Sequence, residues 1–228
     1  VHTVSAVTVW RSGKRISPAV SRLILARSDD VIHRETLDFR LGDFFGDWDE
    51  PADTGIAYPT HRNLPLGEEG IVALRFSNIM VPESSTILFA QLQFGVGVEE
   101  SRPARLKIEA ELSPDPAPFA TEPFATAARS RTSTGIEWDP GTWTIAQAAF
   151  GTQTPSLAPL LQEIIDQEGR PVDAPTLFLI SGSGVREALS REWGPAIAPR
   201  LRIQFDRRSP LEIADEGNQF SVRFENTA

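Results

Sequence analysis

Hydrophobic and polar residues alternate along most of this chain, in short segments separated by Pro and Gly. Where the alternation coincides with β-branched and aromatic residues, it predicts strands. In residues 104–112, for example, Leu106, Ile108 and Ala110 share one face and charged residues share the other, as in a half-buried strand. The predicted strands are 5–10, 21–26, 35–41, 70–76, 85–96, 104–112, 134–138, 175–180, 200–205 and 219–225.

One segment, residues 156–168, has the spacing of a helix instead. Its apolar residues recur every three or four positions, and Gly169 follows as a stop signal. These apolar residues are Leu157, Leu160, Leu161, Ile164 and Ile165. The longest stretch with neither period is 42–69, which we expect to be an irregular loop. Many short strands and a single helix predict an all-β fold, a two-sheet sandwich.

Composition narrows the possible functions. The 228 residues suffice for one β-rich domain with a substantial core, and the formal net charge of -9 argues against non-specific binding to nucleic acid or anionic membranes. The absence of Cys excludes disulfides, thiol nucleophiles and Cys-based metal sites. No apolar run approaches the roughly 20 residues of a membrane span. A start at Val1 suits a processed export precursor or a trimmed fragment.

The segment "SGSG" at 181–184 follows an apolar strand and raises the question of a catalytic turn. A nucleophile elbow needs Gly two positions before and after the Ser, but Ser183 has Ser181 and Val185 there. A phosphate-binding loop would end in Gly-Lys-Ser/Thr, which is absent here. The three His residues form no spaced pair typical of metal sites. We therefore expect no enzymatic activity, and we expect the glycines to turn the chain between two strands.

An acidic cluster in "ARSDDVIHRE" (26–35) is the candidate metal site. Asp29 and Asp30 follow an apolar strand, and Glu35 lies just beyond them. Carboxylates in strand-end loops are typical ligands of Ca²⁺, the one cofactor that the sequence suggests. The alternative is a turn in which the Asp side chains accept hydrogen bonds from backbone N–H groups.

Several large side chains are candidate partner-binding residues. The segment "DFFGDW" places three aromatic rings beside acidic residues in the predicted loop 42–69, and other Trp and Arg residues lie near strand ends. Exposed rings of this kind anchor a protein partner or stack on a sugar, whereas buried ones complete the core of the domain. The candidates are Phe44, Phe45, Trp48, Trp143, Arg186 and Trp193.

Residues 72–94, "VALRFSNIMVPESSTILFAQLQF", resemble a β-sandwich module common in large secreted bacterial proteins. The resemblance continues in "RSRTSTGIEWDPGTWT", "TPSLAPLLQEIIDQEG" and "LFLISGSGVREA", and "ARSDD" resembles an Asp-Asp near the start of that module. It covers roughly residues 21–206 and departs from the usual pattern at Glu83-Ser84 and in the loop 42–69. The resemblance implies a jelly roll, similar to those of carbohydrate-binding and adhesive proteins, with export and recognition rather than catalysis.

Together these features predict an N-terminal arm (1–20), a jelly-roll domain (21–206) and a C-terminal extension (207–228). We expect a non-catalytic, extracytoplasmic interaction module, an accessory subunit that docks onto a larger membrane or surface assembly through its terminal segments and the loop 42–69. The alternative is a carbohydrate-binding module that recognises a polysaccharide. Nucleic acid is not an expected partner, and the chain is expected to lack a membrane span of its own.

Overall fold

The computed structural model describes residues 31–42, 46–59, 63–67, 70–147, 151–209, 211–215 and 220–224. The candidates Phe44, Phe45, Asp29 and Asp30 and the predicted strands 5–10 and 21–26 lie outside these residues. The chain divides into two compact units, His33–Arg208 and Val1–Ile32 with Ser209–Ala228. No helix in the described part of the chain is long and apolar enough to cross a membrane.

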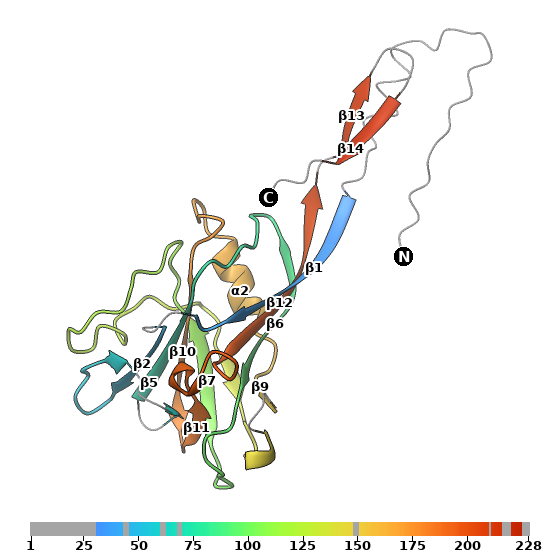
Figure 1. The fold of residues 1–228 in the computed structure, drawn as a ribbon. Coiled ribbons are helices and arrows are strands. Elements are labelled where there is room, and N and C mark those ends of the chain that lie inside the picture. The colour runs from blue at the N-terminus through green and yellow to red at the C-terminus, as the bar shows by residue number, and fades with distance from the viewer. Residues whose placement is uncertain are drawn as a thin grey trace, which may run out of the picture. The chain divides into compact units, whose positions relative to one another are not determined.

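The unit His33–Arg208 consists mainly of antiparallel sheets (Figure 1). One sheet has four strands in the order β1 (Val31–Arg40), β12 (Arg200–Ser209), β6 (Thr86–Phe94) and β9 (Thr152–Gln153). The other has six, in the order β3 (Tyr58–Pro59), β2 (Asp47–Pro51), β5 (Gly70–Phe76), β10 (Thr176–Ser183), β7 (Arg105–Ala110) and β8 (Ile136–Trp138). A smaller sheet pairs β11 (Arg186–Leu189) with β4 (Asn63–Leu66).

The strand order is that of a jelly roll. Successive strands of the chain alternate between the two sheets: β5 precedes β6, β7 and β8 precede β9, and β10 precedes β12. The resulting orders β1-β12-β6-β9 and β5-β10-β7-β8 interleave two Greek keys, which defines this architecture. The prediction of an all-β, two-sheet jelly roll is therefore confirmed.

The core lies between the two sheets because alternate residues of their strands point inward. In the six-stranded sheet, Ile180 of β10 lies opposite Val72 on one side and Ile108 on the other. In the four-stranded sheet, Ile203 of β12 lies opposite Ala90 of β6. All five are buried and belong to one apolar cluster, as the two-residue period of the sequence predicts.

The outer surface of the four-stranded sheet carries partly exposed ion pairs between its strands. Arg34 of β1 pairs with Asp206 of β12, and Asp38 pairs with both Arg200 and Arg202. The hydrogen bond from Arg202, together with the charges of both Arg residues, lowers the pKa of Asp38. Such exposed pairs contribute little to stability individually but favour one register of β1 against β12.

The expected helix is α2 (Ala158–Ile165), shorter than the predicted span 156–168. It buries Leu160, Leu161, Ile164 and Ile165 and packs against β6 and β7 (Figure 1). Gln162 fixes the helix to the start of β6, since its side chain accepts a hydrogen bond from Ile87 N–H and donates one to the carbonyl of Ser85. Two short 3-10 turns, η1 (Ile145–Gln147) and η2 (Arg191–Trp193), complete this unit.

The expectation of an irregular loop over 42–69 is wrong for part of that stretch, because β2, β3 and β4 lie within it. Strand β2 was hidden from sequence analysis because Asp47, Trp48, Asp49 and Glu50 are all buried, so polarity does not alternate. Trp48 stacks on Phe119 with ring centroids 5.2 Å apart. It is therefore a packed side chain of this domain, not an exposed partner anchor.

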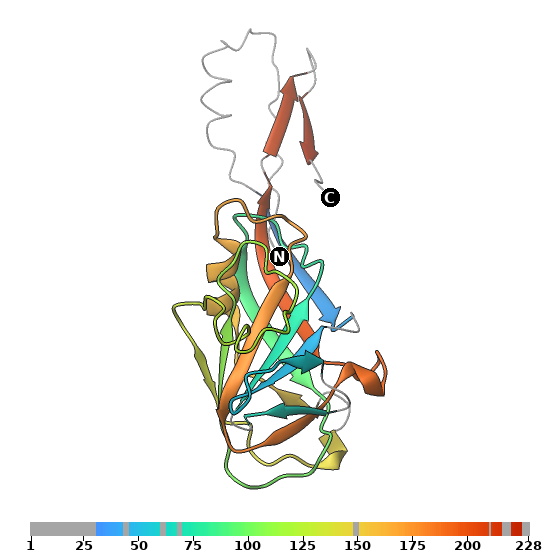
Figure 2. The same cartoon turned by 90° about the vertical axis from the view of Figure 1, so that its left-hand side faces the viewer.

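The "SGSG" segment forms the end of β10 and the turn into β11, so the glycines do turn the chain between strands (Figure 2). Gly182 is still within β10, opposite Leu106 of β7. A Cβ at this position would lie 2.2 Å from the carbonyl oxygen of Arg105, so only glycine allows the two strands to approach. Gly184 follows with φ +73 in the turn itself.

The remaining strands, β13 (Leu211–Asp215) and β14 (Phe220–Phe224), form an antiparallel hairpin of their own. Leu211 lies opposite Phe224 and Asp215 opposite Phe220. β14 corresponds to the predicted strand 219–225, whereas the sequence analysis did not identify β13.

Candidate binding site

The candidate metal ligand Glu35 is engaged in an ion pair. Its carboxylate accepts a hydrogen bond from Nε of Arg207, across the β1–β12 pair. Among the described residues, no group of three or more His, Asp or Glu side chains is placed to hold a metal ion. Because Asp29 and Asp30 lie outside those residues, calcium binding at this end of the sheet stays a prediction.

Trp143 is a core residue and not an exposed partner anchor. Only 1% of its surface is exposed, and its ring packs 6.4 Å from that of Trp138, which stacks on Phe94. Its backbone also forms two hydrogen bonds with Glu100 that join two loops at one end of the sandwich. The Trp143 side chain is therefore part of the packed core of the domain and is not available as a binding surface.

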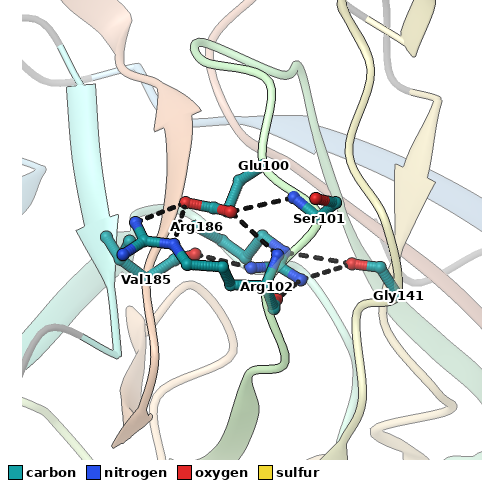
Figure 3. Close-up of polar contacts among 6 residues, drawn as sticks. All are labelled: Glu100, Ser101, Arg102, Gly141, Val185 and Arg186. Atoms are coloured by element: carbon teal, nitrogen blue, oxygen red, sulfur yellow. Dashed lines mark hydrogen bonds and ion pairs between the residues drawn. The ribbon is translucent and has the colours of Figure 1, made fainter.

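Arg186, another predicted partner-binding residue, is also buried. Its guanidinium donates to three backbone carbonyls: Gly141 at 2.6 Å, Arg102 at 2.7 Å and Val185 at 2.7 Å (Figure 3). Burial lowers the pKa of this guanidinium. Arg186 thus ties together three loop segments and does not face a partner.

Beside Arg186, Glu100 organises the same loops. Its carboxylate accepts hydrogen bonds from the backbone N–H groups of Ser101 and Arg102, at 2.9 and 2.8 Å, and from the Arg102 guanidinium (Figure 3). These donors, the Arg102 side chain above all, lower the pKa of Glu100 to about 2. We refer to Arg186, Glu100 and the loops 100–102 and 139–143 as the Arg186 knot.

Among the aromatic candidates that the structure describes, Trp193 remains on the surface and is half exposed. It ends the turn η2, which begins after Ser190, whose hydroxyl accepts a hydrogen bond from Glu192 N–H. The indole N–H of Trp193 donates to Oδ1 of Asn63 at 3.1 Å. The amide of Asn63 in turn donates to Oε2 of Glu187 at 2.7 Å. The ring is therefore fixed at its polar edge while part of it faces solvent.

The loop after β6 completes this surface. The N–H of Gly97 donates to the carbonyl of Glu187 at 2.8 Å, and a Cβ on Gly97 would lie 3.1 Å from Oδ1 of Asn63. Gly97 therefore lets the loop approach the Asn63–Glu187 pair, and the following residue, Val98, is exposed. We call Asn63, Val98, Glu187 and Trp193 the Trp193 cluster.

Sequence analysis identified Trp193 but missed Asn63 and Glu187. These two residues are 124 positions apart and meet because β4 and β11 pair, with Asn63 opposite Leu189 and Leu64 opposite Ala188. The available signal was weak: buried Leu64 and Leu66 alternate with partly exposed Asn63 and Pro65 over only four residues. Without the pairing, neither polar residue could be placed beside a Trp.

No protein family and no characterised protein matches this chain. The function must therefore be inferred from the Trp193 cluster and its surroundings. The cluster combines one half-exposed aromatic ring, hydrogen-bonded at its indole N–H, with an amide, a carboxylate and an exposed apolar side chain. Such an arrangement is suited to a ligand that has both apolar faces and hydroxyl or amide groups.

Proposed function

We propose that the chain is a non-catalytic recognition module that binds a neutral carbohydrate through the Trp193 cluster. The observation that carries this proposal is the fixed, half-exposed ring of Trp193, whose indole N–H is held by the Asn63–Glu187 pair. Of the six partner-binding candidates, Trp48, Trp143 and Arg186 are buried, which weakens the case for docking onto a protein through them.

The chemistry of the cluster suits a sugar ring. A pyranose presents C–H groups on its faces, which pack on an indole ring, and hydroxyl groups at its rim, which bond to amides and carboxylates. Asn63 has a second amide hydrogen and Glu187 a second carboxylate oxygen for such hydroxyls. Because the ring is already immobilised by Asn63, little side-chain entropy would be lost on binding.

The charged residues around the Trp193 cluster indicate which class of sugar would bind. Glu187 lies in the cluster, Glu192 lies next to Trp193 in a turn that also contains Arg191, and the whole chain carries a net charge of -9. Uronic acids and sulfated sugars would be repelled by these carboxylates, whereas a neutral polysaccharide would not. The proposal therefore specifies a neutral glycan.

We include an extracytoplasmic location and the absence of catalysis in this proposal. The failed nucleophile and phosphate motifs support the absence of catalysis, and the resemblance to modules of secreted proteins supports the location. The accessory-subunit hypothesis remains the second candidate, favoured by a different exposed surface that is described below.

The test is binding to defined polysaccharides by affinity gel electrophoresis and calorimetry. The neutral probes are β-glucan, xylan and galactomannan, and the anionic probes are alginate and polygalacturonate. Trp193→Ala should weaken binding to the neutral glycan at least tenfold, on the order of 1.4 kcal/mol. Val172→Ala is the matched control, because Val172 is as exposed as Trp193 (49% against 50%) but lies in the loop between α2 and β10.

Several outcomes would contradict the proposal: no binding to any neutral probe, binding only to the anionic probes, or binding that Trp193→Ala leaves unchanged. Urea unfolding should show that Trp193→Ala costs less than about 1 kcal/mol, as for an exposed side chain. Loss of binding together with loss of the folded state would assign Trp193 to the core instead.

A further inference from the structure

Phe124 has an unusual backbone conformation, with φ at +61. A bulky side chain rarely occupies this left-handed region, because its Cβ approaches the following carbonyl group. Gly and Asn adopt the same conformation at lower cost. A strained residue of this kind is retained either because its side chain fills the core or because it serves a contact outside the domain.

The strained conformation is held by a second loop. Phe124 N–H donates to the carbonyl of Gly55 at 2.7 Å, and Gly55 itself has φ +63. A Cβ on Gly55 would lie 2.5 Å from the Phe124 ring, so the ring lies directly over a glycine. The carboxylate of Glu50 accepts hydrogen bonds from the N–H groups of Thr126 and Ala127, at 2.7 and 2.9 Å, and fixes the following turn.

Despite this support, the Phe124 side chain is not a core residue. It is 49% exposed, and the neighbouring Ile56 is 51% exposed. The two loops, 51–57 and 120–128, contain two acidic residues and no Lys or Arg. We define the Phe124 patch as the exposed residues of these loops: Ala52, Asp53, Thr54, Ile56, Thr121, Glu122, Pro123, Phe124, Ala127 and Ala128.

The combination of strain and exposure argues for a binding role. The folded domain would be more stable with Gly or Asn at position 124, because half of the Phe ring gains nothing from burial. The residue is instead held rigid by Gly55 and by the turn that Glu50 fixes. An apolar ring presented rigidly within an acidic rim suits a partner with apolar and basic side chains.

Residues 1–20 of the same sequence have this complementary chemistry. They contain the basic residues Arg11, Lys14 and Arg15 and no Asp or Glu, in a chain whose net charge is -9. They also contain the apolar, β-branched segment "VSAVTVW" ending at Trp10. Apolar and basic groups in one short segment match the apolar centre and acidic rim of the Phe124 patch.

We propose that the Phe124 patch of one copy docks residues 1–20 of a second copy. A segment that binds a different surface of its neighbour makes a head-to-tail contact, which builds rings or open filaments. Two acidic Phe124 patches would repel each other, so their charge favours this contact over a symmetric one. The proposal is independent of the Trp193 cluster and, like the accessory-subunit hypothesis, uses the N-terminal segment as a docking element.

The first experiment combines stability and self-association in the full chain. Phe124→Asn should raise the melting temperature by about 2–4 °C, because Asn tolerates the left-handed conformation. In sedimentation velocity at rising protein concentration, the unaltered chain should associate, and Phe124→Asn should weaken association at least tenfold. Trp193→Ala and Val172→Ala should leave association unchanged, which separates this proposal from carbohydrate binding.

The second experiment exchanges the charges of the Phe124 patch and of residues 1–20. Ile56→Ser is an additional variant of the patch. Asp53→Lys with Glu122→Lys should abolish association, as should Arg11→Glu with Lys14→Glu and Arg15→Glu. An equimolar mixture of those two variants should associate again, since the acidic arm then meets a basic patch. A chain that stays monomeric at all concentrations, a lowered melting temperature for Phe124→Asn, or association unaffected by these changes would overturn the proposal.

Discussion

Arg186 and Trp193 lie only seven residues apart, at the start of β11 and the end of η2, yet the structure places them in opposite environments. Arg186, the residue type more often found in water, is buried among backbone carbonyls. Trp193, the residue type more often found in cores, remains half exposed. The difference lies in the segments that approach each of them from elsewhere in the chain.

Two loops bring their carbonyls to Arg186, from Gly141 and Arg102, and with the carbonyl of Val185 they give each guanidinium nitrogen an acceptor. At Trp193, the side chain of Asn63 accepts the hydrogen bond of the indole N–H, and half of the residue stays exposed. The polar groups of the Arg186 knot therefore serve the internal structure, whereas the Trp193 cluster has an exposed surface at which we propose that a ligand binds. Mutations in the Arg186 knot should lower the stability of the fold, whereas mutations in the Trp193 cluster should weaken ligand binding.

The largest effect should come from Trp143, the last residue of the 139–143 loop in the knot. Trp143→Ala removes a fully buried ring that packs on Trp138, so we expect a loss of about 3–5 kcal/mol in the free energy of unfolding. Urea unfolding followed by circular dichroism measures this loss, with Trp193→Ala as the matched exposed control. Equal losses of stability for the two variants would show that Trp143 and Trp193 do not differ as core and surface residues.

A somewhat smaller effect is expected for Arg186→Met, which keeps most of the apolar stem but removes the donors. The carbonyls of Gly141, Arg102 and Val185 would lose their hydrogen bonds, at a cost of about 3 kcal/mol. Arg105→Met on the exposed face of β7 is the control and should change stability by less than about 0.5 kcal/mol. If the Arg186→Met protein is stable but loses carbohydrate binding, Arg186 belongs to the ligand-binding site.

The fold was predictable where burial alternates along a strand, as in β7, where a continuous apolar run is buried, as in β10, or where burial follows a helical period, as in α2. It was not predictable in β2, where three of the four successive buried residues are acidic, or in β4, a four-residue strand that contains Pro65. The order of strands depends on pairing between distant segments, which no local period encodes. The jelly-roll order was anticipated from the resemblance alone.

The candidate site, like the fold, was predictable from the sequence only in part. An exposed Trp can be suspected from its position near a strand end, but its partners Asn63 and Glu187 depend on the β4–β11 pairing. The burial of Arg186 depends on three loop segments meeting, and its residue type gave no indication of it. Phe124 carried no sequence signal, because backbone strain becomes visible only when the conformation is known.

The smallest expected effect concerns Glu100, and it depends on pH. The pKa of this carboxyl is lowered from its usual 4.5 to about 2 in the folded protein, chiefly by the Arg102 side chain. A lowered folded-state pKa stabilises the protein above the unfolded-state value, and this stabilisation is lost as pH falls toward the folded-state value. Glu100→Gln, which cannot ionise, lacks this contribution at every pH.

The stability difference between the unaltered protein and Glu100→Gln should therefore be constant above about pH 5. It should shrink as pH falls from about 4.5 toward 2, the window set by the two pKa values of Glu100. Thermal unfolding of both proteins from pH 7 to pH 2.5 measures this difference, and Glu99→Gln is the control because it changes the adjacent, exposed carboxylate. A difference that stays constant across the window, or that appears equally in the control, would show that Glu100 does not hold the knot by its charge. Because the Trp193 cluster shares none of these hydrogen bonds, Glu100→Gln should leave carbohydrate binding at pH 7 unchanged.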